Sequence, residues 1–136
     1  MASPHVLIAD DDRFVQKTLK FCLEEAGYSV ALAENGREAI AAAQTLRPAI
    51  VLLDMFMPEC DGIEALLEIK RRVPEVKIFV MSGGGVNRLY DFLDMAVKFG
   101  AEGVMRKPLS PSALIEMLAA QPGRKTLQDK AKITSG

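Results

Sequence analysis

Five apolar residues precede an aspartate in Ala49–Asp54, which reads AIVLLD. Because no polar residue interrupts the run, it predicts a strand buried on both faces, as in a parallel sheet covered by helices. Similar short runs predict four more strands, and the last of these is assigned mainly from its place in the series. These runs are His5–Ala9, Ser29–Ala33, Val76–Met81 and Glu102–Arg106.

Stretches with apolar residues three and four positions apart lie between these runs and predict helices. Gly27 and Gly100 mark helix C-termini, Asn35 is an N-cap, and Ser110-Pro111 combines an N-cap with proline at the first helical position. Five βα units in a row predict a parallel sheet with helices on both faces. The apolar stripes are Val15, Leu19, Cys22, Leu23 and Ala26; Ala39, Ile40 and Ala43; Ile63, Leu66 and Leu67 behind Asp61; Leu89, Phe92, Leu93 and Ala96; and Leu114, Ile115 and Leu118.

The composition is that of one globular domain: 136 residues, 49% hydrophobic and 26% charged. A formal net charge of -1 gives no indication of a nucleic acid or an anionic membrane as a partner. Cys22 and Cys60 have no histidine or second cysteine at metal-ligand spacing, so we expect free thiols in a reducing cytoplasm. No apolar run approaches the ~20 residues of a membrane span, and the N-terminus lacks a signal peptide. These features predict a cytoplasmic protein.

The helical pattern stops after Pro122-Gly123. The residues that follow carry four bases and one acid, with few large apolar side chains. We therefore expect residues 1–121 to form the domain and residues 122–136 a flexible tail, with a frayed extension of the last helix as the alternative. This segment is too short to be an output domain.

Reactive side chains follow four of the five predicted strands. Asp10 and Asp11 follow the first, Asp54 the third, Ser82 the fourth and Lys107 the fifth. Because the carboxyl ends of parallel strands line one edge of a sheet, these side chains should meet in one crevice. Three carboxylates in one place repel each other, and a hard divalent cation such as Mg²⁺ relieves that repulsion. The cation, the ammonium and the hydroxyl would neutralise a phosphoryl group in transfer.

Asp54 is the best candidate for the nucleophile, because it ends the most buried strand in the middle of the expected crevice. Asp10 and Asp11 are better placed to hold the metal. Asp12 opens the first helix, so we expect an N-cap rather than a metal ligand. Each residue alone has an ordinary explanation in a turn or cap, and the hypothesis depends on their coincidence. The sequence has neither a Walker loop nor a G-x-G-x-x-G turn.

Four motifs closely resemble the receiver domain of two-component response regulators, and the resemblance covers about residues 5–121. It implies a flavodoxin-like, doubly wound α/β fold with a five-stranded parallel sheet of order 2-1-3-4-5, for which receivers are a standard example. It further implies that Asp54 accepts the phosphoryl group. Asp10, Asp11, Asp54 and the backbone carbonyl of Phe56 would bind Mg²⁺, with Mn²⁺ as the alternative metal. Ser82 and Lys107 would contact the phosphoryl group, and a cis peptide would precede Pro108. The motifs are V-L-I-A-D-D-D, D-M-F-M-P-E-C-D-G, F-V-M-S-G and R-K-P-L.

Two departures from the family pattern have functional consequences. Val104 stands where receivers often carry the tyrosine or phenylalanine that reads out phosphorylation, so switching must be expressed otherwise, for instance through the loop Ser82–Asn87. Phe56 and Gly84 offer no side-chain group to orient an attacking water. We therefore expect slow self-dephosphorylation.

Because the segment after residue 121 is too short for an output domain, we expect a stand-alone switch, and the resemblance implies that it has no separate substrate to turn over. Its donor would be a phosphohistidine on a histidine kinase or phosphotransfer protein, docking near Phe14, Val15 and Pro108. For Phe14 the alternative is packing in the core or as a hydrophobic staple. The downstream protein target is not identified by the sequence, and a monomer or weak homodimer is expected.

One functional alternative is a constitutive interaction module, which Val104 favours. The other is a hydrolase of the haloacid-dehalogenase type, which Phe56 disfavours because that family needs a second aspartate at this position.

Overall fold

The structure is a computed structural model that describes residues 5–57, 62–83 and 94–120. Within the described residues, five strands alternate with five helical segments, in agreement with the predicted βα units. Residues 94–98 are also helical and lie between β4 and β5. The other elements are β1 (Val6–Ala9), α1 (Arg13–Glu25), β2 (Val30–Ala33), α2 (Gly36–Leu46), β3 (Ile50–Asp54), α3 (Gly62–Arg72), β4 (Lys77–Ser82), β5 (Gly103–Arg106) and α5 (Pro111–Ala119).

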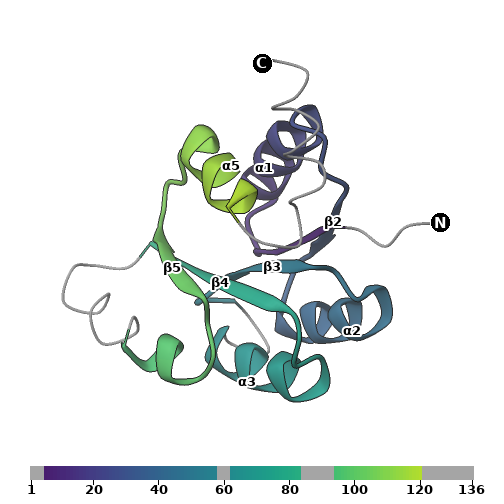
Figure 1. Cartoon of the computed structure of the whole chain (residues 1–136), viewed down its shortest axis with the longest axis vertical. Helices are drawn as coiled ribbons and strands as arrows, with labels where there is room; N and C mark the ends of the chain where they lie inside the picture. Colours follow the sequence, from purple (N-terminus) through teal and green to yellow (C-terminus); the bar gives the residue numbers. More distant parts are fainter. Residues whose placement is uncertain (1–4, 58–61, 84–93, 121–136) are drawn as a thin grey trace.

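The strands form one parallel sheet of order β2-β1-β3-β4-β5, which confirms the predicted fold class. Helices α1 and α5 cover one face of the sheet, and α2 and α3 cover the other (Figure 1). Two hydrophobic cores result, one on each face.

Strand β3 lies in the middle of the sheet, and every one of its residues is buried. Val51 and Leu53 pack in the core under α2 and α3, while Ile50 and Leu52 pack in the core under α1 and α5. Alternate side chains of a strand point to opposite faces, so a strand with helices on both sides needs apolar residues at every position. This explains the uninterrupted run in the sequence.

The predicted helix ends are present where the structure describes them. Asp12 caps α1 by accepting hydrogen bonds from the N–H groups of Phe14 and Val15, and Asn35 caps α2 through the N–H of Glu38. Ser110 caps α5, with Pro111 as the first helical residue. Gly27 and Gly100 have positive φ angles of 98° and 109°, which glycine adopts without steric strain.

Two members of the predicted apolar stripes are exposed, Leu67 on α3 and Ala26, which lies at the C-cap of α1 where the helix has ended. Leu67 was assigned to the buried stripe of α3 but is 45% exposed, because the inner face of that helix is formed by Ala65, Leu66 and Ile69. Phe14 is 78% exposed, so its alternative assignment to core packing is wrong.

Several predictions fall outside the described residues. They concern Asp61, the first part of the fourth helix, Cys60, the loop beyond Gly83 and the tail at 122–136. Cys22 is a free cysteine, as expected. None of the helices in the described part of the chain combines the length and the apolar character that a membrane crossing requires.

Candidate phosphoryl and metal site

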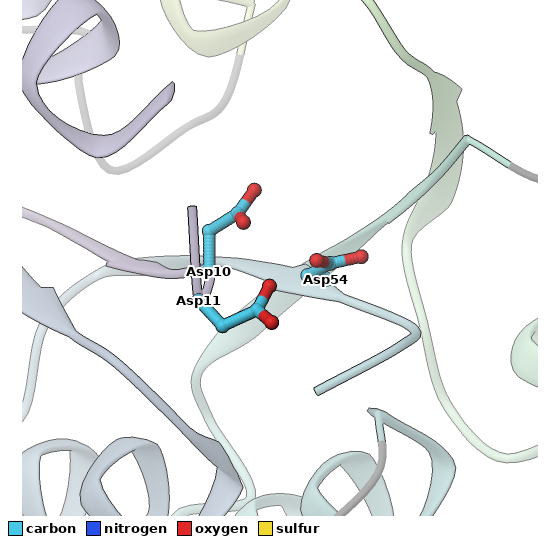
Figure 2. Close-up of side chains that lie close together, drawn as sticks. All are labelled: Asp10, Asp11 and Asp54. Carbon is cyan, nitrogen blue, oxygen red and sulfur yellow. The ribbon is translucent and has the colours of Figure 1, made fainter. Parts of the chain in front are cut away.

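Three carboxylates meet at the carboxyl edge of the sheet. Because Ala9 of β1 pairs with Leu53 of β3, the next residues along the two strands, Asp10 and Asp54, lie at the same level of the sheet. Oxygens of Asp10, Asp11 and Asp54 all lie within 4.8 Å of one another, and Figure 2 shows the side chains together at this edge. Asp10 and Asp54 are buried, whereas Asp11 is exposed. Such a set of carboxylate oxygens, open to solvent on one side, suits a hard cation such as Mg²⁺.

Lys107 supplies a positive charge to the same cluster. Its Nζ lies 2.6 Å from Oδ2 of Asp10 and 3.2 Å from Oδ2 of Asp54. Burial of the amine lowers the pKa of Lys107, but its hydrogen bonds and ion pairs with the two aspartates outweigh this effect and leave the pKa raised. Lys107 therefore remains an ammonium at neutral pH and can pair with an anion at this edge.

Asp54 is held in an environment that disfavours its charged form. Burial, together with the charge of Asp10, raises the pKa of Asp54 to about 6, against the opposing effects of Lys107 and of the Phe56 N–H, which donates to Oδ1. A divalent cation bound to the three acids would favour the carboxylate form instead.

Ser82 is the last residue of β4 and is buried, with 1% of its surface exposed. The pairing of Asp54 with Met81 puts Ser82 one residue beyond the level of Asp54 on the neighbouring strand. Its carbonyl accepts a hydrogen bond from the N–H of Lys107, at 2.9 Å. The backbone thus ties together the strand ends that carry the hydroxyl and the ammonium.

Asp12 stands apart from these acids. Its side chain caps α1, and its N–H donates to Oδ1 of Asp10 at 2.9 Å.

The N–H of Phe56 donates a hydrogen bond to Oδ1 of Asp54, so the peptide of Phe56 is next to the carboxylate cluster. The peptide before Pro108 is cis, in agreement with the expectation from the resemblance.

Gly62 is a residue of the site region that the sequence analysis missed. A Cβ at this position would lie 2.5 Å from the Cα of Met55 and 2.6 Å from the carbonyl oxygen of Asp54. The Gly62 N–H donates to the carbonyl of Met55 at 2.9 Å, so the start of α3 is docked on the backbone that follows Asp54. The glycine at the end of the D-M-F-M-P-E-C-D-G motif was the available signal, because close backbone approach is a common reason for glycine.

A pocket of about 350 Å³ leads from the surface of α1 to the site. It is lined by Phe14 and Val15 on one side and by Pro108 and Leu109 on the other, and it reaches Lys107. A protein bound over this pocket would lie close to the carboxylate cluster.

The profile of the response regulator receiver domain matches residues 6–119 of the chain. The chain belongs to this family. The receiver is similar to the chemotaxis protein CheY of Thermotoga maritima, with 42% identity over 114 residues that cover 83% of this chain and 92% of the relative. It is 34% identical over 127 residues to the response regulator MprA of Mycolicibacterium vanbaalenii, covering 93% of this chain but 53% of that protein.

Its fold also matches a solved CheX–CheY–BeF3–Mg²⁺ complex from Borrelia burgdorferi, with a TM-score of 0.77 and 27% identity over 85% of this chain and 86% of that one. A receiver is a signalling switch rather than an enzyme that turns over a separate substrate, as predicted. The alternative of a haloacid-dehalogenase-type hydrolase is therefore wrong.

Proposed function

We propose that this receiver accepts a phosphoryl group on Asp54 in a Mg²⁺-dependent reaction and acts as a stand-alone switch that signals through protein contacts. The main support is the convergence of three carboxylates within 4.8 Å with the Lys107 ammonium bridging two of them. Asp10, Asp11, Asp54 and the Phe56 carbonyl would hold the metal, with Mn²⁺ as the alternative. When bound, the cation supplies positive charge to the phosphoryl oxygens.

The residues of the chain then have separate roles. A carboxylate oxygen of Asp54 attacks the phosphorus, a P–O bond forms, and the P–N bond to the donor histidine breaks. The electron pair of that bond stays on the imidazole, which takes up a proton from water. Lys107 leaves its pairing with the free carboxylates to pair with the phosphoryl oxygens, and the Ser82 hydroxyl donates to them. The new contacts bias the receiver toward a second conformation.

The donor would be a phosphohistidine on a histidine kinase or a histidine phosphotransfer protein. Phe14 projects into solvent beside the pocket that reaches Lys107, which provides an apolar anchor next to the reacting groups. The downstream partner would be another protein. We further propose that the receiver acts in the cytoplasm, as a monomer or a weak homodimer.

Val104 favours one alternative, a constitutive interaction module. Val104 lies in β5, where it pairs with Val80 of β4 and is half-buried. The position that reads out phosphorylation in many receivers thus carries no aromatic ring or hydroxyl here.

Incubation with Mg²⁺ and acetyl phosphate, followed by intact mass measurement, distinguishes the two functions. The proposal predicts a phosphoryl adduct on the wild type and none on Asp54→Asn or in the presence of EDTA. Replacement of Mg²⁺ by Mn²⁺ should also give the adduct. Absence of an adduct on the wild type would contradict the proposal and support the constitutive module.

A further inference from the structure

A polar side chain is buried on the inner face of α1, directly behind the metal-binding acids. Gln16 is 5% exposed on a helix face that is otherwise formed by apolar residues such as Leu19 and Leu23. A buried amide needs hydrogen-bond partners, and its choice of partners shows what it does.

Both partners of Gln16 are backbone carbonyls at strand ends. Its Nε2 donates to the carbonyl of Asp10 and to the carbonyl of Ala33, each at 2.7 Å. The ladder between β1 and β2 ends at the pair Ala9 and Ala33, so the Asp10 carbonyl lies beyond the last paired residue of its strand. Gln16 provides the donor that the neighbouring strand no longer supplies.

The carbonyl of Asp10 belongs to the peptide that joins Asp10 to Asp11. Rotation of this peptide would turn the Asp11 side chain relative to that of Asp10 and change the distance between the two carboxylates. Asp10 is otherwise held through its N–H, which donates to the carbonyl of Ala33 at 3.1 Å, and through its carboxylate, whose Oδ1 accepts from the Asp12 N–H and whose Oδ2 pairs with Lys107. Only the contact with Gln16 acts on the carbonyl side of the peptide among the interactions of the described residues.

We propose that Gln16 is a positioning residue of the metal site, and that its amide fixes the Asp10–Asp11 peptide so that both carboxylates face one cation. The inference rests on the proposed function of that site. The side chain needs two donors and no acceptor toward the backbone, which the amide NH₂ group of glutamine provides. In other metal sites, mutation of a residue that orients a metal ligand lowers the metal affinity by about 10- to 100-fold.

The test is the affinity for Mg²⁺, measured by titration calorimetry on the full chain. Gln16→Met keeps the length and removes the donors, and we expect its dissociation constant for Mg²⁺ to rise about tenfold or more. Gln44→Met is the matched control, because Gln44 is exposed on α2 and bonds Arg72 far from the acids. Its affinity should equal that of the wild type.

Phosphorylation by acetyl phosphate provides a second readout. In Gln16→Met the Mg²⁺ concentration for half-maximal rate should rise by the same factor as the dissociation constant, while the rate at saturating Mg²⁺ stays near that of the wild type. A merely structural role would lower the urea midpoint of unfolding and leave the Mg²⁺ affinity unchanged, and that result would overturn the inference.

A further variant covers the case in which Gln16→Met does not fold. Gln16→Asn keeps an amide but is one carbon shorter, so it cannot reach both carbonyls, and it should also bind Mg²⁺ more weakly. Wild-type affinity in a folded Gln16→Asn would overturn the inference. If the wild type itself binds no Mg²⁺ and forms no adduct, the proposed function is wrong. If the wild type does both and the Gln16 variants bind Mg²⁺ with the same affinity, only the positioning role is wrong.

Discussion

Asp54 combines two requirements that oppose each other at the scale of a single residue. As the proposed nucleophile Asp54 must be ionised. It is nevertheless buried and faces the Asp10 carboxylate, and both features raise its pKa to about 6. An acid whose pKa is higher in the folded state than in the unfolded state binds its proton more tightly when folded. Its contribution to stability is therefore present at low pH and is lost as the pH rises from about 4 through about 6.

This gives a prediction for Asp54→Asn, which carries no charge at any pH. Without metal at pH 7.5, the variant should have a free energy of unfolding higher than the wild type by on the order of 1–2 kcal/mol, and the difference should vanish near pH 4. Urea denaturation in EDTA measures both values. Asp94→Asn, which changes an exposed acid, should show no such pH-dependent gain. An equal difference at both pH values would mean that the charge of Asp54 is not the cause.

Under the proposed function, Phe56 should affect a second property of Asp54, the lifetime of a phosphoryl group on its carboxylate. Its ring is 42% exposed next to the Asp54 carboxylate and has no polar atom to orient a water molecule. We expect slow loss of phosphate after the donor is removed, and several-fold faster loss in Phe56→Asn, whose amide can hold a water. Intact mass followed over time measures both rates. A wild-type half-life of seconds would contradict this expectation.

At the scale of the elements, most of the fold could be predicted from the sequence, because periodicity reports burial directly. The uninterrupted run of β3 indicated a central strand, and the strand-end residues Asp10, Asp54 and Lys107 indicated where the site lies. Interactions that depend on backbone approach in three dimensions could not be derived in this way. Nothing in the sequence pattern distinguishes Gln16 from other polar residues of the first helix, and the need for Gly62 appears only when α3 is seen against the end of β3.

The docking of α3 on β3 gives the prediction for this scale. In Gly62→Ala the new Cβ would overlap the backbone of Asp54 and Met55, so α3 must shift. We expect a loss of about 1–3 kcal/mol in the free energy of unfolding, typical of overpacking, together with weaker Mg²⁺ binding. Gly103→Ala is the control, because its nearest neighbours would lie at 3.5 and 3.6 Å, an ordinary contact distance. Equal stability of the two variants would show that α3 can move freely.

At the scale of the whole molecule, the proposed docking surface is separate from the groups of the proposed chemistry. Phe14 is exposed on α1 and contributes no group to the carboxylate cluster. In Phe14→Glu we therefore expect phosphorylation by acetyl phosphate at the wild-type rate. Transfer from a purified phosphorylated histidine kinase that phosphorylates the wild type should be at least tenfold slower, because loss of an interface anchor costs about 2 kcal/mol or more. Phe21→Glu, also on α1 but outside the pocket, serves as a comparison. An equal loss with both donors would indicate that Phe14 supports the fold rather than docking.

Metal binding at the proposed site would couple it to the stability of the entire domain, since the three acids come together only in the folded chain. Asp10 and Asp11 follow β1 and Asp54 ends β3, so an unfolded chain does not present them to one cation. A ligand that binds only the folded state raises its stability by RT ln(1 + [L]/Kd), or about 2.7 kcal/mol at a concentration of 100 times Kd.

Urea denaturation at rising Mg²⁺ should show this logarithmic increase in the wild type. Asp11→Ala removes the exposed carboxylate and leaves the ion pair between buried Asp10 and half-buried Lys107 intact, so it should fold but lose most of the increase. If Asp11→Ala responds to Mg²⁺ as strongly as the wild type, the stabilising ion is bound at a different place.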